Sequence, residues 1–396
     1  MRAFATVFLA GLALSISACS DQAVPLLGDP IQLELPTEAA DGPRLTEGPD
    51  SDLVLSWMLR GPDGTSLKYA ALRNGGFGPT REAVFEPRMF VNWADLPGVV
   101  HVEGTHWLAH WLRYSADLTY SYDVVLAQSF DDGQTWSEPL PMHTDGTLTE
   151  HGFVSTYRSS DGVALLWLDG RQTPEGPMTL RTATATASGE RVAEMVIDDS
   201  VCDCCQTNVA VSANGPVAVY RDRTSEEIRD IYVTRFEEGS WQPGERLHAD
   251  DWKIPGCPVN GPSIVADGQN VAVAWFTAAN GEPKVKLVRS TDGGKTFAAP
   301  VEVASGAISG YVGLAMVPDG HLAISWVSRG SETGNAIHLG LVDSASNPGS
   351  VHVIADGIQQ VRLFPQLGYQ DGALYLFWTD EADGTRHLFG AQIPVD

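Results

Sequence analysis

Residues 262–275 read PSIVADGQNVAVAW, and residues 283–303 read PKVKLVRSTDGGKTFAAPVEV. An apolar strand, a Gly-containing turn and a second strand ending in an aromatic residue come first. A polar loop and two further strands around a tight turn follow. Alternating apolar residues between Gly, Asp and Asn turns are typical of short antiparallel strands. This stretch therefore predicts a four-stranded antiparallel unit.

The same unit recurs along the whole chain. Its second strand ends in an aromatic residue seven times, 51 to 56 residues apart: Trp57, Trp111, Trp167, Tyr220, Trp275, Trp326 and Trp378. A single four-stranded sheet cannot cover both of its apolar faces, so repeated sheets stack around a ring. The repeat predicts an all-β fold, a seven-bladed β-propeller. The last unit lacks its outermost strand, and we expect residues 30–35 to supply it and close the ring.

Composition agrees with this fold and excludes some partners. The 396 residues include 40 glycines and 24 prolines, which are unfavourable inside helices. Acidic residues outnumber basic ones by 50 to 25, so the formal net charge is −25. This charge repels phosphate backbones, and nucleic acid is an unsuitable partner. We expect a monomer.

The N-terminal segment reads as a targeting signal. A positive start and a short apolar run end in Ile-Ser-Ala-Cys19, which resembles the lipobox of bacterial lipoproteins. The resemblance implies a signal peptide at 1–18, an acylated Cys19, a lipidated tether at 19–29 and one propeller domain at 30–396. An ordinary signal peptide is the alternative. We expect a lipid-anchored protein of the bacterial cell envelope, at the outer membrane, on its periplasmic face or on the cell surface.

Two turns carry a sharper motif. Residues 129–136, SFDDGQTW, and residues 290–297, STDGGKTF, match S-x-D-x-G-x-T-[WF], the Asp-box (BNR repeat) of the sialidase superfamily. Aspartate accepts backbone hydrogen bonds in such a hairpin cap, and glycine permits positive φ. The chain thus resembles sialidase-like propellers, and the resemblance implies structural roles for Asp131, Gly133, Trp136, Asp292, Gly294 and Phe297.

Cysteines are the least ordinary feature. Cys202, Cys204 and Cys205 open the fourth unit, and Cys257 precedes the fifth. Disulfides are one interpretation, since secretion leads to an oxidising compartment. A soft-metal site is another, in which the thiolates, with His151 nearby, would bind Cu(I) or Zn(II). A mixture of one bridge and two reactive thiols is a third.

The resemblance to sialidases also implies catalytic residues. Such enzymes clamp a substrate carboxylate with three arginines and use an aspartate acid and a tyrosine nucleophile. On this pattern Tyr311 would be the nucleophile and Asp95 the acid. Four arginines are candidates for the clamp: Arg44, Arg221, Arg223 and Arg362. The chain differs from these sialidases in having seven units rather than six.

Other polar residues fall on the loops of the same propeller face, where ligands bind. We expect Trp93, Asp169, Arg171 and Asp222 to contact a ligand there. The first functional hypothesis is a ligand-binding or redox/metal-handling envelope protein with a cysteine-rich site on this face. The alternatives are an exo-sialidase-type glycoside hydrolase for acidic sugars, and a scaffold that binds another envelope protein.

Overall fold

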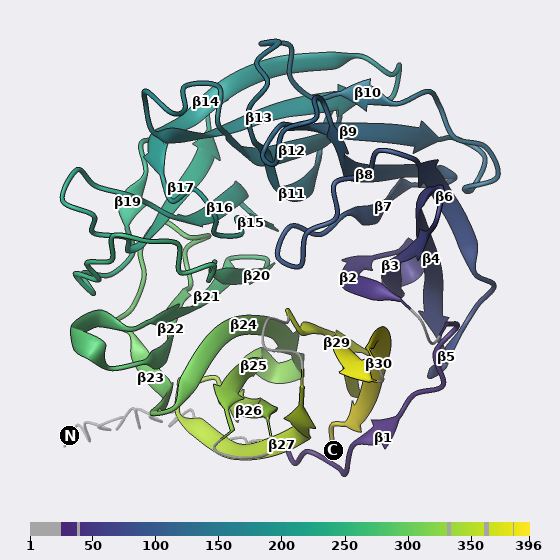
Figure 1. The fold of residues 1–396 in the computed structure, drawn as a ribbon. Helices are drawn as coiled ribbons and strands as arrows, with labels where there is room; N and C mark the ends of the chain where they lie inside the picture. The colour runs from purple at the N-terminus through teal and green to yellow at the C-terminus, as the bar shows by residue number, and fades with distance from the viewer. Residues whose placement is uncertain (1–24, 38–39, 331–333, 360–363, 383) are drawn as a thin grey trace, which may run out of the picture.

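The computed structural model describes residues 25–37, 40–330, 334–359, 364–382 and 384–396. Cys19 and Arg362 lie outside these ranges. Seven antiparallel sheets surround a central axis (Figure 1). Only 2% of the chain is helical, and three short 3-10 turns are present in the described part: η1 (Pro49–Ser51), η2 (Ala279–Gly281) and η3 (Pro318–Gly320). No helix among the described residues is long and apolar enough to cross a membrane.

The first four blades follow the chain in order. Blade 1 contains β2 (Asp41–Glu47), β3 (Leu53–Gly61), β4 (Gly64–Arg73), β5 (Gly76–Phe77) and β6 (Arg81–Glu86). Blade 2 contains β7 (Gly98–Glu103), β8 (His106–Tyr114), β9 (Tyr122–Ser129) and β10 (Leu140–Pro141). Blade 3 contains β11 (His151–Ser159), β12 (Gly162–Asp169), β13 (Met178–Thr186) and β14 (Arg191–Val201). Blade 4 contains β15 (Asn208–Ser212), β16 (Gly215–Arg221), β17 (Ile231–Glu237), β18 (Ser240–Trp241) and β19 (Glu245–Arg246).

The remaining three blades complete the ring. Blade 5 contains β20 (Ser263–Asp267), β21 (Asn270–Thr277), β22 (Lys284–Ser290) and β23 (Val301–Ser305). Blade 6 contains β24 (Ile308–Val317), β25 (His321–Arg329), β26 (Asn335–Val342) and β27 (Pro348–Ile358). Blade 7 contains β28 (Gln366–Gln370), β29 (Ala373–Ala382), β30 (Thr385–Pro394) and, from the other end of the chain, β1 (Ile31–Gln32).

Closure by the N-terminal strand is confirmed. Ile31 pairs with Gln392 and Gln32 with Ala391, antiparallel to β30. The Leu33 N–H donates to the Gly390 carbonyl at 2.9 Å, so the ladder continues past the strand itself. The free edge of blade 7 is thereby covered, which removes a site for unwanted strand pairing.

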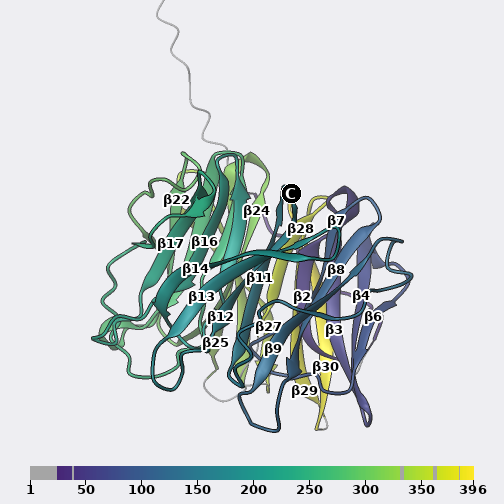
Figure 2. The ribbon, with the colours of Figure 1, turned by 90° about the horizontal axis from the view of Figure 1, so that it is seen from above.

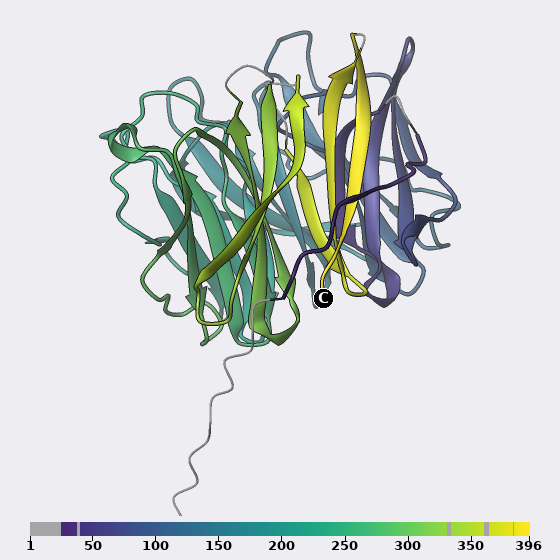
Figure 3. The same ribbon diagram turned by 90° about the horizontal axis from the view of Figure 1, so that it is seen from below.

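The core lies between neighbouring blades. The seven aromatic residues of the repeat all lie in second strands, one to four residues before the strand ends rather than at its end, and are at most 8% exposed. Each apolar cluster contains residues of two successive sheets; Trp167 of β12, for example, packs with Leu126 of β9. Seen from the side, the strands run from one face of the ring to the other (Figures 2 and 3). Stacking of the sheets therefore supplies the burial that no single sheet has.

The two motif turns follow β9 and β22, the third strands of their blades. In the first, the Gly133 N–H donates to Ser129 Oγ at 2.9 Å, and the Thr135 N–H donates to Asp131 Oδ1 at 2.8 Å. The second turn repeats both bonds, each at 2.9 Å, among Ser290, Asp292, Gly294 and Thr296. The aromatic residues that close the motifs, Trp136 and Phe297, pack against the apolar clusters.

Removing the closing strand should destabilise the ring. A chain that begins at residue 37 loses the pairing with β30, and we expect its thermal midpoint to fall by roughly 5–10 °C relative to a chain that begins at residue 25. Differential scanning calorimetry of the two chains measures this. Equal midpoints would show that β1 contributes nothing to closure.

Candidate functional site

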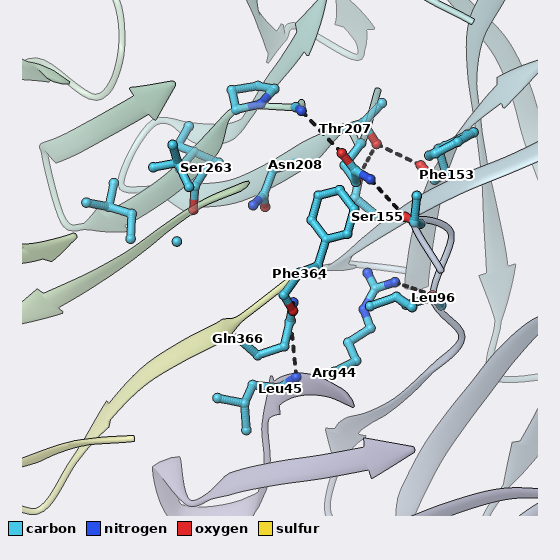
Figure 4. A pocket seen from close by; sticks show the side chains of 18 of the residues that line it. Arg44, Leu45, Leu96, Phe153, Ser155, Thr207, Asn208, Ser263, Phe364 and Gln366 are labelled. Carbon is cyan, nitrogen blue, oxygen red and sulfur yellow. Dashed lines mark hydrogen bonds between the residues drawn. The ribbon is translucent and has the colours of Figure 1, made fainter. Parts of the chain in front are cut away.

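A cavity of about 250 Å³ lies where the innermost strands converge. Its walls come from β2, β11, β15, β20, β24 and β28 together with the loop before β7. Figure 4 shows the Arg44 and Phe364 side chains pointing into the space between these strands. Residues far apart in sequence supply its polar groups: Arg44, Asp95, Ser155, Thr207, Asn208 and Gln366.

Asp95 is the acidic group of this cavity. It lies in the loop between β6 and β7, is 2% exposed, and accepts the Phe153 N–H at 2.7 Å. Phe153 has a φ of 56° within a bulge of β11, which turns its N–H toward the carboxyl. A Cβ at Gly152 would lie 2.1 Å from Asp95 Oδ2, so glycine is required for this approach. Burial raises the pKa of Asp95 to about 7, and a proton is therefore available near neutral pH.

Arg44 supplies the positive charge. It lies on β2 and donates to the Leu96 carbonyl at 2.8 Å and to the Val154 carbonyl at 2.9 Å. These bonds tie blade 1 to the loop before β7 and to β11. Burial lowers its pKa to about 10, opposed by attraction to Asp95, so the guanidinium stays charged at neutral pH. An acid and a cation predicted from separate parts of the sequence thus share one cavity.

Uncharged polar groups line the rest of the wall. Ser155 Oγ and Thr207 Oγ1 are 2.8 Å apart, and the Thr207 hydroxyl donates to the Phe153 carbonyl at 3.1 Å (Figure 4). The Gln366 and Asn208 amides also face the cavity. Hydroxyl and amide groups both donate and accept, which suits the hydroxyls of a small polar ligand.

Three aromatic side chains meet beside this wall. Trp93 stacks on Phe364 with ring centroids 5.4 Å apart, and Tyr311 meets Phe364 edge-on at 4.8 Å. Tyr311 has a φ of 54°, and its N–H donates to Asn260 Oδ1 at 2.7 Å. The structure therefore brings together Trp93, expected to bind ligand, and Tyr311, expected as nucleophile, next to a residue that lines the cavity.

Besides Tyr311, a tyrosine that the sequence analysis did not identify lies near the cavity, and this one is hydrogen-bonded to a carboxylate. The Tyr122 hydroxyl donates to Glu150 Oε1 at 2.5 Å. A Cβ at Gly152 would meet Tyr122 as well as Asp95, so the two residues flank the same glycine. Burial raises the pKa of Glu150. Tyr122 begins the third strand of its blade and carries no motif; only the position of Glu150, just before β11, could have pointed to it.

The other predicted arginines have different surroundings. Arg221 is 2% exposed and donates to the carbonyls of Asn260, Arg229 and Phe276 at 2.6–2.9 Å. All three of its guanidinium nitrogens thus donate to the main chain, and Arg221 does not line the cavity as Arg44 does, which excludes it from the proposed clamp. Arg223 is partly exposed and pairs with Asp203 and Glu227.

Asp169 and Arg171 form a buried ion pair. Arg171 Nη2 lies 2.7 Å from Asp169 Oδ2, and Asp169 is completely buried. His151, expected near the cysteines, lies here instead: its ring stacks on His143 at 3.6 Å, and Nε2 is 3.3 Å from Asp145 Oδ2. The aspartates, the histidines and Arg171 thus contact one another, and together they form a polar network between blades 2 and 3.

Asp222 directly follows β16 of blade 4 and is 8% exposed. Burial raises its pKa to about 7, with a further contribution from Asp198. Its N–H donates to the Asp230 carbonyl at 3.0 Å. Asp222 is not among the residues that line the cavity described above.

The four cysteines come together on the loops of blades 4 and 5. Cys202, Cys204 and Cys205 follow β14 directly, and Cys257 lies in the loop before β20. All four carry free thiols. The Cys202 and Cys205 sulfurs are 3.2 Å apart, and the Cys257 thiol lies close enough to that of Cys204 to interact with it. Cys205 is followed by Gln206, a residue of the cavity wall.

No family model and no curated protein matches the sequence. Among solved structures, the α-L-arabinofuranosidase Arb93A of Fusarium graminearum is 12% identical; the match covers 94% of this chain and 98% of that chain, with a TM-score of 0.50. The Penicillium chrysogenum α-L-arabinanase is 16% identical, with 82% and 99% covered and a TM-score of 0.50. Polysaccharide lyase Uly1 is 10% identical, with 90% of each chain covered and a TM-score of 0.52. At these identities the likeness concerns the fold alone, and the predicted seven-bladed β-propeller is confirmed.

Burial of Asp95 predicts a pH-dependent stability difference. Its folded pKa of about 7 exceeds the unfolded value of 3.8, so the stabilisation by its bound proton is complete at low pH and disappears as pH rises through 7. Relative to Asp95→Asn, the wild-type free energy of unfolding should fall by up to about 1.4 kcal/mol per pH unit between pH 5 and 7. Urea unfolding at several pH values measures the difference. A difference that does not change with pH would contradict the assignment.

Proposed function

We propose that this chain is a sugar-acting propeller that binds a saccharide in the central cavity and cleaves its glycosidic bond. The observation that carries the proposal is the buried Asp95, which shares the cavity with Arg44 and has a pKa of about 7. A glycosidase acid must hold a proton at the pH at which it works, and burial of a carboxyl group is the usual way to achieve this.

Each part of the wall has a role in this reaction. The Arg44 guanidinium would pair with the carboxylate of an acidic sugar, which favours that substrate class over neutral sugars. Asp95 would donate its proton to the glycosidic oxygen as the carbon–oxygen bond breaks, and water would complete the hydrolysis. The aromatic group of Trp93, Tyr311 and Phe364 would pack against the apolar face of the sugar ring. Tyr311 stays the proposed nucleophile: its hydroxyl oxygen would bond to the anomeric carbon as the glycosidic bond breaks, its proton would pass to water, and a further water would then release the sugar from Tyr311.

The similar structures support this direction. They include an α-L-arabinofuranosidase, an arabinanase and a polysaccharide lyase, all named for action on sugars. We further propose that Cys19 is acylated and holds the propeller at the cell envelope, where glycans are available as substrates. The hypothesis of metal or redox handling concerns the cysteine cluster and does not depend on whether the cavity cleaves a sugar.

A panel of fluorogenic glycosides tests the proposal. We expect release of 4-methylumbelliferone from a sialic acid or glucuronic acid glycoside, and less from the α-L-arabinofuranoside, because only the first two offer Arg44 a carboxylate. Asp95→Asn should lower kcat/KM by about 100-fold or more, since it removes the proton donor. Activity of the wild type should fall as pH rises through about 7.

Asp161→Asn is the matched control. Asp161 is exposed at the turn between β11 and β12 and does not line the cavity, so its amide variant should retain full activity. Tyr311→Phe should also lose activity through loss of the nucleophile. Unchanged activity of Asp95→Asn would contradict the catalytic assignment. Absence of both turnover and saccharide binding would leave the protein-binding scaffold as the better function.

A further inference from the structure

Four thiols from two loops converge at one place on the ring. The sulfurs of Cys202, Cys204 and Cys205 all lie within 4.8 Å of one another. Cys257, from the loop between β19 and β20, reaches the Cys204 thiol. Cys202 and Cys205 are buried, Cys204 is half-buried and Cys257 is exposed. The cluster is thus closed toward the core and open on one side, where Cys257 lies.

The spacing of these cysteines suits a metal ion. Cys202 and Cys205 are separated by two residues, the spacing of paired thiolate ligands in many zinc sites. Thiolates bound at about 2.3 Å around one tetrahedral ion lie roughly 3.8 Å from each other. The sulfurs of Cys202 and Cys205 are 3.2 Å apart and all three sulfurs lie within 4.8 Å of one another, so small side-chain movements would bring them to this separation.

The charge around the sulfurs favours thiolates over a disulfide. Arg229 Nη1 donates to Cys202 Sγ at 3.3 Å, and the Arg229 side chain is only 3% exposed. Nε and Nη2 of the same guanidinium donate to Glu227 Oε2 at 3.2 and 2.8 Å, and Nη1 is directed at the sulfur. A thiolate, or a metal-bound thiolate, accepts a hydrogen bond from a buried guanidinium much more strongly than a neutral disulfide sulfur does.

We propose that Cys202, Cys204 and Cys205 bind one thiophilic metal ion, Zn(II) or Cu(I), with Cys257 as the exposed ligand through which the ion enters. Each thiol that binds releases its proton, and no change of oxidation state is needed when the ion arrives as Zn(II) or Cu(I). Arg229 offsets part of the negative charge of the thiolates, as hydrogen-bonded neighbours of metal ligands do.

A bound ion would also fix one wall of the cavity. Gln206, next to Cys205, donates to the Ala94 carbonyl at 2.8 Å and accepts the Gly261 N–H at 3.2 Å. The metal would therefore join the turn after β14 to the loop before β20 at the point where both reach the cavity. Because it binds the folded chain, it should raise the thermal midpoint of the reduced protein.

Titration of the reduced full-length protein with Co(II), as a probe for Zn(II), tests the proposal. We expect one equivalent to bind, with thiolate-to-metal charge-transfer bands and the visible bands of tetrahedral cobalt. Zn(II) should bleach these bands, and Cu(I) competed against a chelator of known affinity decides which ion binds more tightly. Cys205→Ser should weaken Co(II) binding by at least about tenfold, and Cys257→Ser by less, since Cys257 lies at the edge of the cluster.

The wild-type titration does not depend on how well the variants fold. Reduced thiols at Cys202, Cys204, Cys205 and Cys257 without Co(II), Zn(II) or Cu(I) binding would overturn the proposal. So would protein isolated without reductant that contains no metal and no free thiol at these four positions, because two disulfides would then account for the cluster. Neither result depends on whether the cavity hydrolyses glycosides.

Discussion

Closure of the ring is the constraint on which the rest of the structure depends. Seven sheets can stack face to face only if the last meets the first, and blade 7 is complete only when β1 pairs with β30. The aromatic residues of the second strands then become buried between blades. This arrangement needs no helix and tolerates long loops, which leaves loop sequences free to carry chemistry.

The cavity is a direct consequence of that closure. Innermost strands from different blades meet around the axis, so Arg44 of blade 1 comes close to the Val154 carbonyl of blade 3. A side chain there loses most of its water, which raises the pKa of Asp95 and lowers that of Arg44. Burial destabilises both charged forms, and for this reason the cavity holds a carboxyl group that keeps its proton near neutral pH next to a guanidinium that stays charged.

The fold could be predicted from the sequence because a constant repeat leaves few architectures. The motif turns were also predictable, since their hydrogen bonds are local. The site was harder, because its members meet only across blades. Ser155, on β11, and Thr207, just before β15, carry no sequence motif, and only the ring brings their hydroxyl oxygens 2.8 Å apart. Arg221 looked like a ligand-binding arginine but is engaged with main-chain carbonyls, and His151 joins aspartates rather than thiols. The surroundings of Arg221 and His151 depend on which side chains are buried together, and the sequence pattern alone does not show this.

The ionisation of Asp95 links fold and function, since only a closed ring buries this carboxyl group beside Arg44. Its titration can be observed directly by NMR, with ¹³C-labelled aspartate and the Asp95→Asn variant to assign the resonance. The burial described above predicts a midpoint near 7. A midpoint near 4, as for a hydrated aspartate, would show that the cavity does not hold a protonated acid and would contradict the proposed chemistry.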